Sequence, residues 1–488
     1  MTLVISCILL ALCIYRCSGC VKPDLRPIYH LAPPKGWMND PNGFSFFQGE
    51  YHLFYQYNPY SSLEAGIANW GHAKSKDLFR WEDLPIAMEP DEPYDKSGVF
   101  SGSALIENGT MYLYYTGNLN PTGNYDEVHE QTQELATSTD GVKVTKYKDN
   151  PVIVAANRQP NIRDPKVWKH GSQYYMVLGN SFENNTLGRV LLYVSDDRIN
   201  WSEASILAES NGTLGYMFEC PDFFELDGYF VLLFSPQGIK PQGDKYRNLY
   251  QTGYIIGKFD YDTNEFTQIT EFKELDHGHD FYATQTIEDP KGRRILVAWN
   301  DMWEQVYPER EDGWTGQMTL PRVLSLSKDL QLIQKPVKEV QGVFGGNLYS
   351  GKGRKGTKVT LSDNAGRIKL KANKRQSLEL IIEGAGVNGT VKISYDATCG
   401  QVTLDRGGED GVRRTEWTPK DEHIHWDIYV DHSSVELFCG KGDVAFSSRY
   451  FPDGPVSVRL GDNSSAKDFT VTKMLRTVAL PEPSIRQY

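Results

Sequence analysis

The sequence predicts an all-β protein in which a five-bladed β-propeller is followed by a C-terminal β-sandwich. Three observations predict this fold. The 488 residues are 12% aromatic and include 44 glycines and 25 prolines, which favours strands and turns over helices. A two-strand pattern recurs five times in the first part of the chain, and shorter alternating strands follow it. Because 40% of the residues are hydrophobic, a core can form and global disorder is excluded.

Residues 1–20 have the pattern of a secretory signal peptide. An apolar stretch from Leu3 to Tyr15 is too short to span a bilayer, and small residues follow it. We therefore expect cleavage after about Gly19 or Cys20 and a secreted, extracellular protein. Two alternatives stay open, namely a buried N-terminal strand or helix and a lipid anchor on Cys20.

Residues 21–324 contain the repeat that predicts the propeller. Each copy has a short strand, a turn with a glycine and a strongly apolar, aromatic strand. The second strands begin 60, 62, 56 and 65 residues apart. They are Tyr51–Tyr57, Met111–Gly117, Gln173–Asn180, Tyr229–Ser235 and Arg294–Asp301. This regular spacing favours five blades over the alternative of one large β-sandwich.

The periodicity ends before the polar segment 325–342, which we predict to be a linker. Residues 343–488 hold shorter alternating runs separated by turns rich in Gly, Asp and Asn, which is typical of a β-sandwich. Cys399 and Cys439 lie in this region, and we hypothesise that they pair if the compartment is oxidising.

The charge balance narrows the possible partners. The chain has 51 Lys and Arg against 63 Asp and Glu, a net charge of −12, and no basic stripe. We therefore expect neither nucleic acid nor a membrane surface as a partner. We also expect no metal and no cofactor, because no Cys/His cluster offers ligands. Six Asn-x-Ser/Thr sequences fit a secreted glycoprotein: Asn108, Asn184, Asn200, Asn211, Asn388 and Asn463.

Polar or acidic residues stand at the start of the first strand of each hairpin. They are Asp40, Ser101, Asp164, Glu219 and Asp280. If these strands are the innermost strands of the blades, their starts converge at one mouth of the propeller. A proline follows three of the acids closely and should hold the preceding residue in the extended region. The alternative, that these motifs only mark where strands begin, explains one of them more easily than three.

Several carboxylates in one aromatic funnel suit the hydrolysis of glycosides. The polar neighbours of Asp40 should keep it ionised as a nucleophile. Glu219 follows an apolar run, Tyr216–Phe218, which should desolvate it, raise its pKa and suit it to act as acid and base. Arg163 should hold Asp164 ionised, so that Asp164 can bind hydroxyl groups and stabilise positive charge.

The motifs that carry these acids resemble those of the β-fructofuranosidases of glycoside hydrolase family 32. They are WMNDPNG at 37–43, RDP at 163–165 and ECP at 219–221, supported by YNP at 57–59, WGHA at 70–73, FSGS at 100–103 and DFYA at 280–283. The resemblance implies the propeller and sandwich, with Asp40 as nucleophile, Glu219 as acid and base and Asp164 as transition-state stabiliser. It also implies substrate-binding roles for Trp37, Asn39, Gln56, Trp70, Phe100, Ser101, Arg163 and Trp314. By the same resemblance Asp431 and Glu436 belong to a run that we expect to stabilise the sandwich or its interface.

The resemblance implies a retaining β-fructofuranosidase of the invertase type, acting on sucrose without a cofactor, and the predicted signal peptide implies that it is secreted. One alternative is a sucrose-6-phosphate or fructan hydrolase, and another is a fructosyltransferase. A sugar-binding propeller without catalysis is the alternative from a different class. The chain departs from the family at 61–67, where a tryptophan is common, and Glu64 in this segment can offer a polar contact instead.

Overall fold

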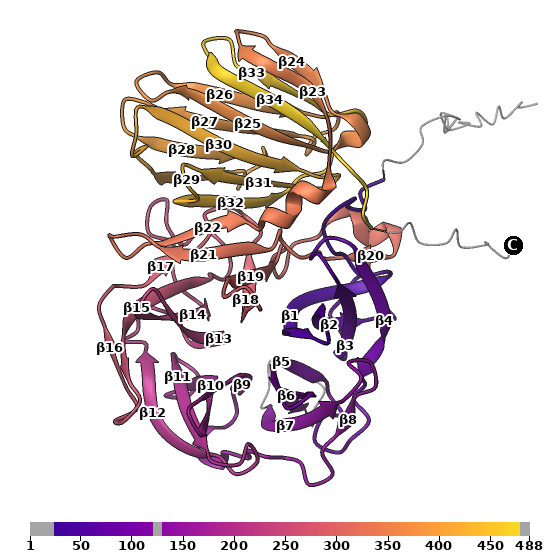
Figure 1. The fold of residues 1–488 in the computed structure, drawn as a ribbon, viewed down its shortest axis with the longest axis vertical. Coiled ribbons are helices and arrows are strands. Elements are labelled where there is room, and N and C mark those ends of the chain that lie inside the picture. The colour runs from indigo at the N-terminus through magenta and orange to yellow at the C-terminus, as the bar shows by residue number, and fades with distance from the viewer. Residues whose placement is uncertain (1–23, 121–128, 479–488) are drawn as a thin grey trace, which may run out of the picture.

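The computed structural model of the protein describes residues 24–120 and 129–478, and its regular structure is almost entirely β-strand (Figure 1). The prediction of an all-β fold is confirmed. The expected signal peptide, residues 1–20, lies outside the described residues. The described residues hold four short 3-10 helices, η1 (Ala156–Arg158), η2 (Pro308–Asp312), η3 (Lys338–Val343) and η4 (Ser362–Asn364). None of the helices in this part of the chain is long and apolar enough to cross a membrane.

Five antiparallel sheets follow one another along the chain. The first contains β1 (Gly36–Phe47), β2 (Glu50–Asn58), β3 (Asn69–Ser75) and β4 (Trp81–Met88). The second contains β5 (Val99–Glu107), β6 (Thr110–Leu119), β7 (Glu130–Ser138) and β8 (Thr145–Lys146). The third contains β9 (Ile162–His170), β10 (Gln173–Phe182), β11 (Leu187–Ser195) and β12 (Ser202–Glu209). The fourth contains β13 (Met217–Leu226), β14 (Tyr229–Gln237), β15 (Gly253–Asp260), β16 (Glu265–Gln268) and β17 (Lys273–Glu274). The fifth contains β18 (Tyr282–Glu288), β19 (Arg294–Trp299), β21 (Arg322–Leu326) and β22 (Leu332–Pro336).

These five sheets are arranged in a ring (Figure 1). The first strand of each sheet contacts the first strand of the next, and β18 contacts β1, so the innermost strands close the circle. β20 (Trp314–Thr315) adds to the first sheet in parallel with β1 and ties the end of the ring to its beginning. The five predicted hairpin glycines, from Gly49 to Gly292, have φ between 59° and 88°, a backbone conformation that glycine adopts without a steric penalty.

Two six-stranded sheets form the sandwich and enclose a separate apolar core. One contains β23 (Phe344–Gly353), β34 (Ala466–Met474), β25 (Gly366–Asn373), β30 (His423–Val430), β31 (Ser434–Cys439) and β32 (Val444–Arg449). The other contains β24 (Lys358–Thr360), β33 (Ser457–Leu460), β26 (Leu378–Glu383), β27 (Thr390–Asp396), β28 (Gln401–Asp405) and β29 (Val412–Glu416).

The sandwich is joined to the ring by a buried set of charges, here called the interdomain ion cluster: His30, Asp276, Arg322, Asp431 and Glu436. Arg322 contacts Asp276 at 2.9 Å and Glu436 at 2.6 Å. His30 contacts Asp431 at 2.8 Å and Glu436 at 2.9 Å. Asp431 and Glu436 therefore lie at the domain interface, where their motif was expected to act.

Two predictions about this half of the chain are wrong. The segment 325–342, predicted to be a linker, contains β22 and η3, and β22 completes the fifth sheet beside β21. The buried residues Leu332 and Ile333 are adjacent in β22, and this apolar run is too short to stand out in a polar segment. Cys399 and Cys439 are both free thiols, because Cys439 faces the buried core and Cys399 is exposed.

Candidate active site

A β-bulge interrupts the first strand of every sheet in the ring. The pairing register shifts between Met38 and Pro41 in β1, at Ser101 in β5, at Asp164 in β9, after Glu219 in β13 and at Ala283 in β18. Bulges bend a strand and re-aim its side chains. At the motifs with an acid before proline, the regular hydrogen bonding between strands is interrupted. The carboxylates of these motifs therefore lie at the inner edge of the ring.

The backbone of Asp164 differs from the prediction. Its φ is 66°, in the left-handed region, whereas the proline after it was expected to hold it extended. The bulge causes the difference: the backbone N–H of Asp164 donates to Thr116 Oγ1 at 3.0 Å instead of continuing the ladder. Cys220, which precedes Pro221 in the bulge of β13, also has a positive φ, of 47°.

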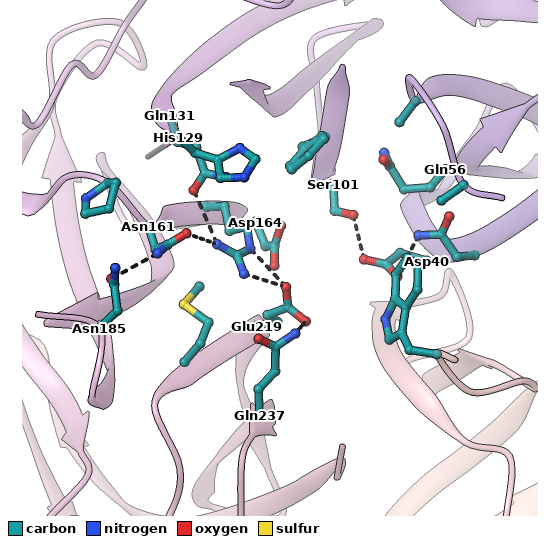
Figure 2. Close-up of a pocket in the computed structure, with 18 of the residues that line it drawn as sticks. Asp40, Gln56, Ser101, His129, Gln131, Asn161, Asp164, Asn185, Glu219 and Gln237 are labelled. Carbon is teal, nitrogen blue, oxygen red and sulfur yellow. Dashed lines mark hydrogen bonds and ion pairs between the residues drawn. The ribbon is translucent and has the colours of Figure 1, made fainter. Parts of the chain in front are cut away.

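The bulged strands bring the three predicted acids to one pocket (Figure 2). It has a volume of about 1160 Å³ and is lined by Asp40 from β1, Ser101 from β5, Arg163 and Asp164 from β9 and Glu219 from β13. These residues are up to 179 positions apart in the chain, between Asp40 and Glu219. The pocket lies at the ring centre, where the sequence predicted a funnel.

Asp40 is held by polar side chains in a buried setting. Its carboxylate accepts hydrogen bonds from Ser101 Oγ at 2.7 Å and from Asn39 Nδ2 at 3.1 Å. Burial, together with the charge of Glu219, nevertheless raises its pKa, and the two hydrogen bonds only oppose this rise. The polar neighbours of Asp40 were predicted correctly, but they do not dominate its ionisation.

Glu219 has a strongly polar environment, which the sequence did not indicate. Arg163 donates to Oε1 through Nε at 2.9 Å and Nη2 at 2.7 Å. Gln237 Nε2 and the Tyr282 hydroxyl donate to Oε2, at 2.8 and 2.5 Å. The expected apolar run contributes only in part: Tyr216 and Met217 line the pocket, whereas Phe218 packs in a core between sheets.

Asp164 does not receive the guanidinium that was predicted for it. Burial and the charge of Glu219 raise its pKa to about 7, and Arg163, which is bonded to Glu219, only partly offsets them. Oδ2 of Asp164 accepts a hydrogen bond from the Cys220 backbone N–H at 2.9 Å. Asp40 and Asp164 thus lie close together, since Cys220 Sγ contacts one carboxylate at 3.4 Å and the other at 3.7 Å.

Cys220 itself is a packed residue. Burial and the three neighbouring acids raise the pKa of its thiol well above the ordinary value, so the group stays neutral. Cys220 is therefore a small packed side chain and not a nucleophile.

The predicted binding residues divide into two groups. Asn39, Gln56, Phe100, Ser101 and Arg163 line the pocket. The three tryptophans do not: Trp37 and Trp70 are buried in apolar clusters between sheets, and Trp314 is covered by Arg26 at 4.6 Å. Trp70 instead supports the pocket from behind, because its Nε1 donates to the Phe100 carbonyl at 3.0 Å. Their proposed role as sugar-facing aromatics is therefore corrected to packing.

Sequence reasoning missed several residues that line the pocket or contact its acids: Trp303, Gln237, Tyr282, His129, Gln131, Asn161 and Asn185. Most of them lie outside the repeated first strands. Tyr282 stands within the DFYA motif, which could have identified it. Trp303 lies on a loop after the fifth repeat, so the repeat could not have identified it.

One group of side chains could hold a metal ion, contrary to expectation, but it lies outside the pocket. Among the described residues Asp421, His423 and His425 place one ligand atom each within 4.8 Å of one another on the sandwich. Lys467 Nζ already contacts His423 Nε2 at 2.8 Å, and no acid of the pocket is near this group in the fold.

Comparison of the sequence with models of known protein families identifies the family of this chain. Residues 30–336 match the glycosyl hydrolases family 32 N-terminal domain, and residues 343–474 match the family 32 C-terminal domain. The chain belongs to glycoside hydrolase family 32. Together the two matches cover the ring and the sandwich and place the boundary after β22. The chain is therefore a glycoside hydrolase.

Individual members of family 32 are similar over most of their length. A sucrose-6-phosphate hydrolase from Zymomonas mobilis is 39% identical over 466 residues, covering 89% of this chain and 88% of the relative. A raffinose invertase from Escherichia coli is 37% identical over 443 residues, covering 87% and 89%. A solved β-fructofuranosidase of family 32 from Bombyx mori is 42% identical, with a TM-score of 0.87 and coverage of 93% of this chain and 95% of the other.

Proposed function

We propose that the protein is a retaining β-fructofuranosidase that hydrolyses sucrose to glucose and fructose. The proposal rests on one observation, the convergence of Asp40, Asp164 and Glu219 in a single pocket. We assign the ring as a five-bladed β-propeller, each sheet one blade, because its innermost strands close on themselves.

In the proposed mechanism Asp40 attacks C2 of the fructosyl unit while Glu219 transfers its proton to the glycosidic oxygen. The C2–O bond breaks, glucose leaves, and fructose remains bound as an ester of Asp40. Glu219, now a carboxylate, removes a proton from water, and the water oxygen attacks C2 and frees Asp40. Hydrogen bonds from Arg163, Gln237 and Tyr282 hold the Glu219 carboxylate in place during both steps.

The charges of the pocket favour sucrose over sucrose 6-phosphate. The described lining includes four carboxylates, those of Asp40, Glu64, Asp164 and Glu219, while Arg163 is the one Lys or Arg and is bonded to Glu219. A phosphate dianion would meet like charge without a partner in this lining.

Initial rates on sucrose, sucrose 6-phosphate, raffinose and inulin test the proposal. We expect kcat/KM for sucrose to exceed that for sucrose 6-phosphate by at least about tenfold, since like-charge contacts cost a kcal/mol or more. Equal or faster hydrolysis of sucrose 6-phosphate would assign the chain to the phosphorylated substrate. The variant Asp40→Asn is the matched control for a contaminating sucrase.

We further propose that the protein is secreted and glycosylated. The support is the sequence of residues 1–20 together with the exposure of all six acceptor asparagines. N-terminal sequencing of protein recovered from the culture medium of a eukaryotic host should give a start near residue 21. Enzymatic removal of N-glycans should increase its mobility on a gel, and an intact N-terminus retained inside the cells would contradict secretion.

A further inference from the structure

One acid and two histidines gather on the outer face of the sandwich. His423 and His425 are the first and third residues of β30, and Asp421 stands two positions before the strand. Side chains alternate along a strand, so residues two positions apart share a face. Ile424 and Trp426, which alternate with the histidines, are buried in the sandwich core. The two imidazole rings therefore project together from the opposite face of the sheet.

Two contacts hold Asp421 against the histidines. The backbone N–H of His423 donates to Asp421 Oδ1 at 2.7 Å, which turns the carboxylate toward the strand. The other carboxylate oxygen, Oδ2, lies 3.3 Å from His425 Nε2. One ligand atom from each of the three residues lies within 4.8 Å of the other two. The three side chains thus converge on one point above the sheet.

These separations are close to those that a bound ion requires. Ligand atoms about 2.0–2.2 Å from one tetrahedral ion lie about 3.3–3.6 Å apart. The contact between Asp421 and His425 already has this length. Their side chains are 61% and 40% exposed, so small rotations can close the remaining gap to His423. The backbone need not move, because β30 is paired with β25 on one side and β31 on the other.

The ligand atoms indicate the class of ion. Two imidazole nitrogens and one carboxylate oxygen suit Zn²⁺, Ni²⁺ and Cu²⁺, whereas Mg²⁺ and Ca²⁺ prefer oxygen ligands. Lys467 shows that His423 has a lone pair to offer, because its Nζ lies 2.8 Å from His423 Nε2 and an ammonium group can only donate. A metal ion bound to His423 would compete with Lys467 for this lone pair.

We propose that Asp421, His423 and His425 form a binding site for a divalent transition-metal ion of the zinc, nickel and copper class. The site is separate from the proposed hydrolysis, because it belongs to the sandwich, which lies beside the ring, and none of its residues lines the pocket (Figure 1). Three protein ligands leave one coordination position for water. The bound ion joins the segment before β30 to the strand, so it stabilises the sandwich and takes no part in catalysis.

Titration of the full chain with Zn²⁺ in a calorimeter tests the proposal. We expect a single ion to bind per chain at this site, and Mg²⁺ not to replace it. His425→Asn should weaken Zn²⁺ binding at least about tenfold, since even the loss of a group that only supports a ligand has an effect of this size. His170→Asn, at an exposed histidine of the ring, is the matched control and should bind Zn²⁺ as the wild type does. Hydrolysis of sucrose should be unchanged in both variants.

A second variant should change the affinity in the opposite direction. Lys467→Met should tighten Zn²⁺ binding about fivefold, because it removes both the competing donor and a positive charge beside the ion. The electron paramagnetic resonance spectrum of the Cu²⁺ complex identifies the ligands directly. It should show coupling to two imidazole nitrogens in the wild type and to one in His425→Asn.

An exposed thiol, Cys399, also lies on the sandwich and can bind the same ions, so Cys399→Ser is titrated in parallel. Zn²⁺ binding that persists in His425→Asn and disappears in Cys399→Ser would assign the ion to the thiol and overturn the inference. Absence of Zn²⁺ binding in the wild type would overturn it as well.

Discussion

The active-site pocket and the interdomain ion cluster each bring three carboxylates together, but the cluster offers them two positive groups and the pocket offers only one. In the cluster, burial opposes ionisation, but the hydrogen bond and charge of His30 lower the pKa of Asp431 to about 2. The charge of Arg322, together with the hydrogen bond from His30, lowers the pKa of Glu436. The same contacts raise the pKa of His30 to about 9 despite its burial. In the pocket a single guanidinium faces three acids, and the pKa values of Asp40 and Asp164 rise.

The difference teaches how one residue type serves two purposes in this fold. At the interface, the lowered pKa values keep Asp431 and Glu436 ionised, and their ion pairs hold the two domains together. In the pocket, burial and uncompensated negative charge raise the pKa values of Asp40 and Asp164, a perturbation that is typical of active sites. We therefore expect the pocket acids to lower the stability of the folded protein and to be needed for activity. We expect the ion cluster to raise the stability of the folded protein and to take no part in catalysis.

The largest expected effect is the loss of activity on removing a pocket acid. Asp40→Asn and Glu219→Gln should each lower kcat/KM for sucrose by at least about 10⁴-fold, because one loses the nucleophile and the other the proton donor. Both variants should stay folded, as checked by circular dichroism. Activity within tenfold of wild type in either would show that the pocket acids are not the reacting groups.

Loss of the central cation of the cluster should affect stability instead. Arg322→Met leaves Asp276 and Glu436 without their guanidinium partner, which should lower the free energy of unfolding by about 3–5 kcal/mol. Urea denaturation measures this change. Arg375→Ala, at an exposed ion pair, is the control and should cost less than about 1 kcal/mol. Equal effects in the two variants would remove the distinction between the cluster and the surface.

Much of this arrangement could be predicted from the sequence, because the hairpin repeat and the acid–proline motifs recur at fixed positions. Asp40, Asp164 and Glu219 were identified because each begins a first strand. The ion partners could not be identified in this way, since Arg163 precedes Asp164 in the chain but its side chain reaches Glu219 across the ring. Adjacency in sequence does not give the direction of a side chain on a bulged strand.

The tryptophans show the same limit. Trp37, Trp70 and Trp314 stand in motifs, yet their size makes them fill the spaces between sheets. Trp303 belongs to no motif, and its place in the pocket depends on the tertiary packing of its ring against Trp37 and Trp299. Strand β22 was missed because its five residues are too few for periodicity to identify a strand.

The pH dependence of stability gives a smaller effect with a definite sign. The pKa of Asp164 is near 3.8 in the unfolded chain and about 7 in the folded one, so its ionisation destabilises the folded protein as the pH rises through this window. Asp164→Asn should therefore be more stable than wild type by about 1–3 kcal/mol at pH 8, and by much less at pH 4. Thermal melts at both pH values measure the difference. A variant less stable than wild type at pH 8 would contradict the charge imbalance.

The smallest expected effect is that of Cys220, which contacts both Asp40 and Asp164 but only as a neutral thiol. Cys220→Ser keeps a small hydrogen-bond donor at this position, so kcat/KM for sucrose should stay within about tenfold of wild type. Loss of activity as complete as in Asp40→Asn would show that the sulfur itself reacts.

The central claim, that Asp40 and Glu219 act in turn through a fructosyl ester, is tested most directly by trapping the intermediate with methanol. The enzyme is incubated with sucrose in a water–methanol mixture, and the methyl fructoside formed is identified by NMR. Two displacements at C2 predict methyl β-D-fructofuranoside, and the Asp40→Asn control should form none. Formation of the α-anomer would mean a single displacement and would contradict the account.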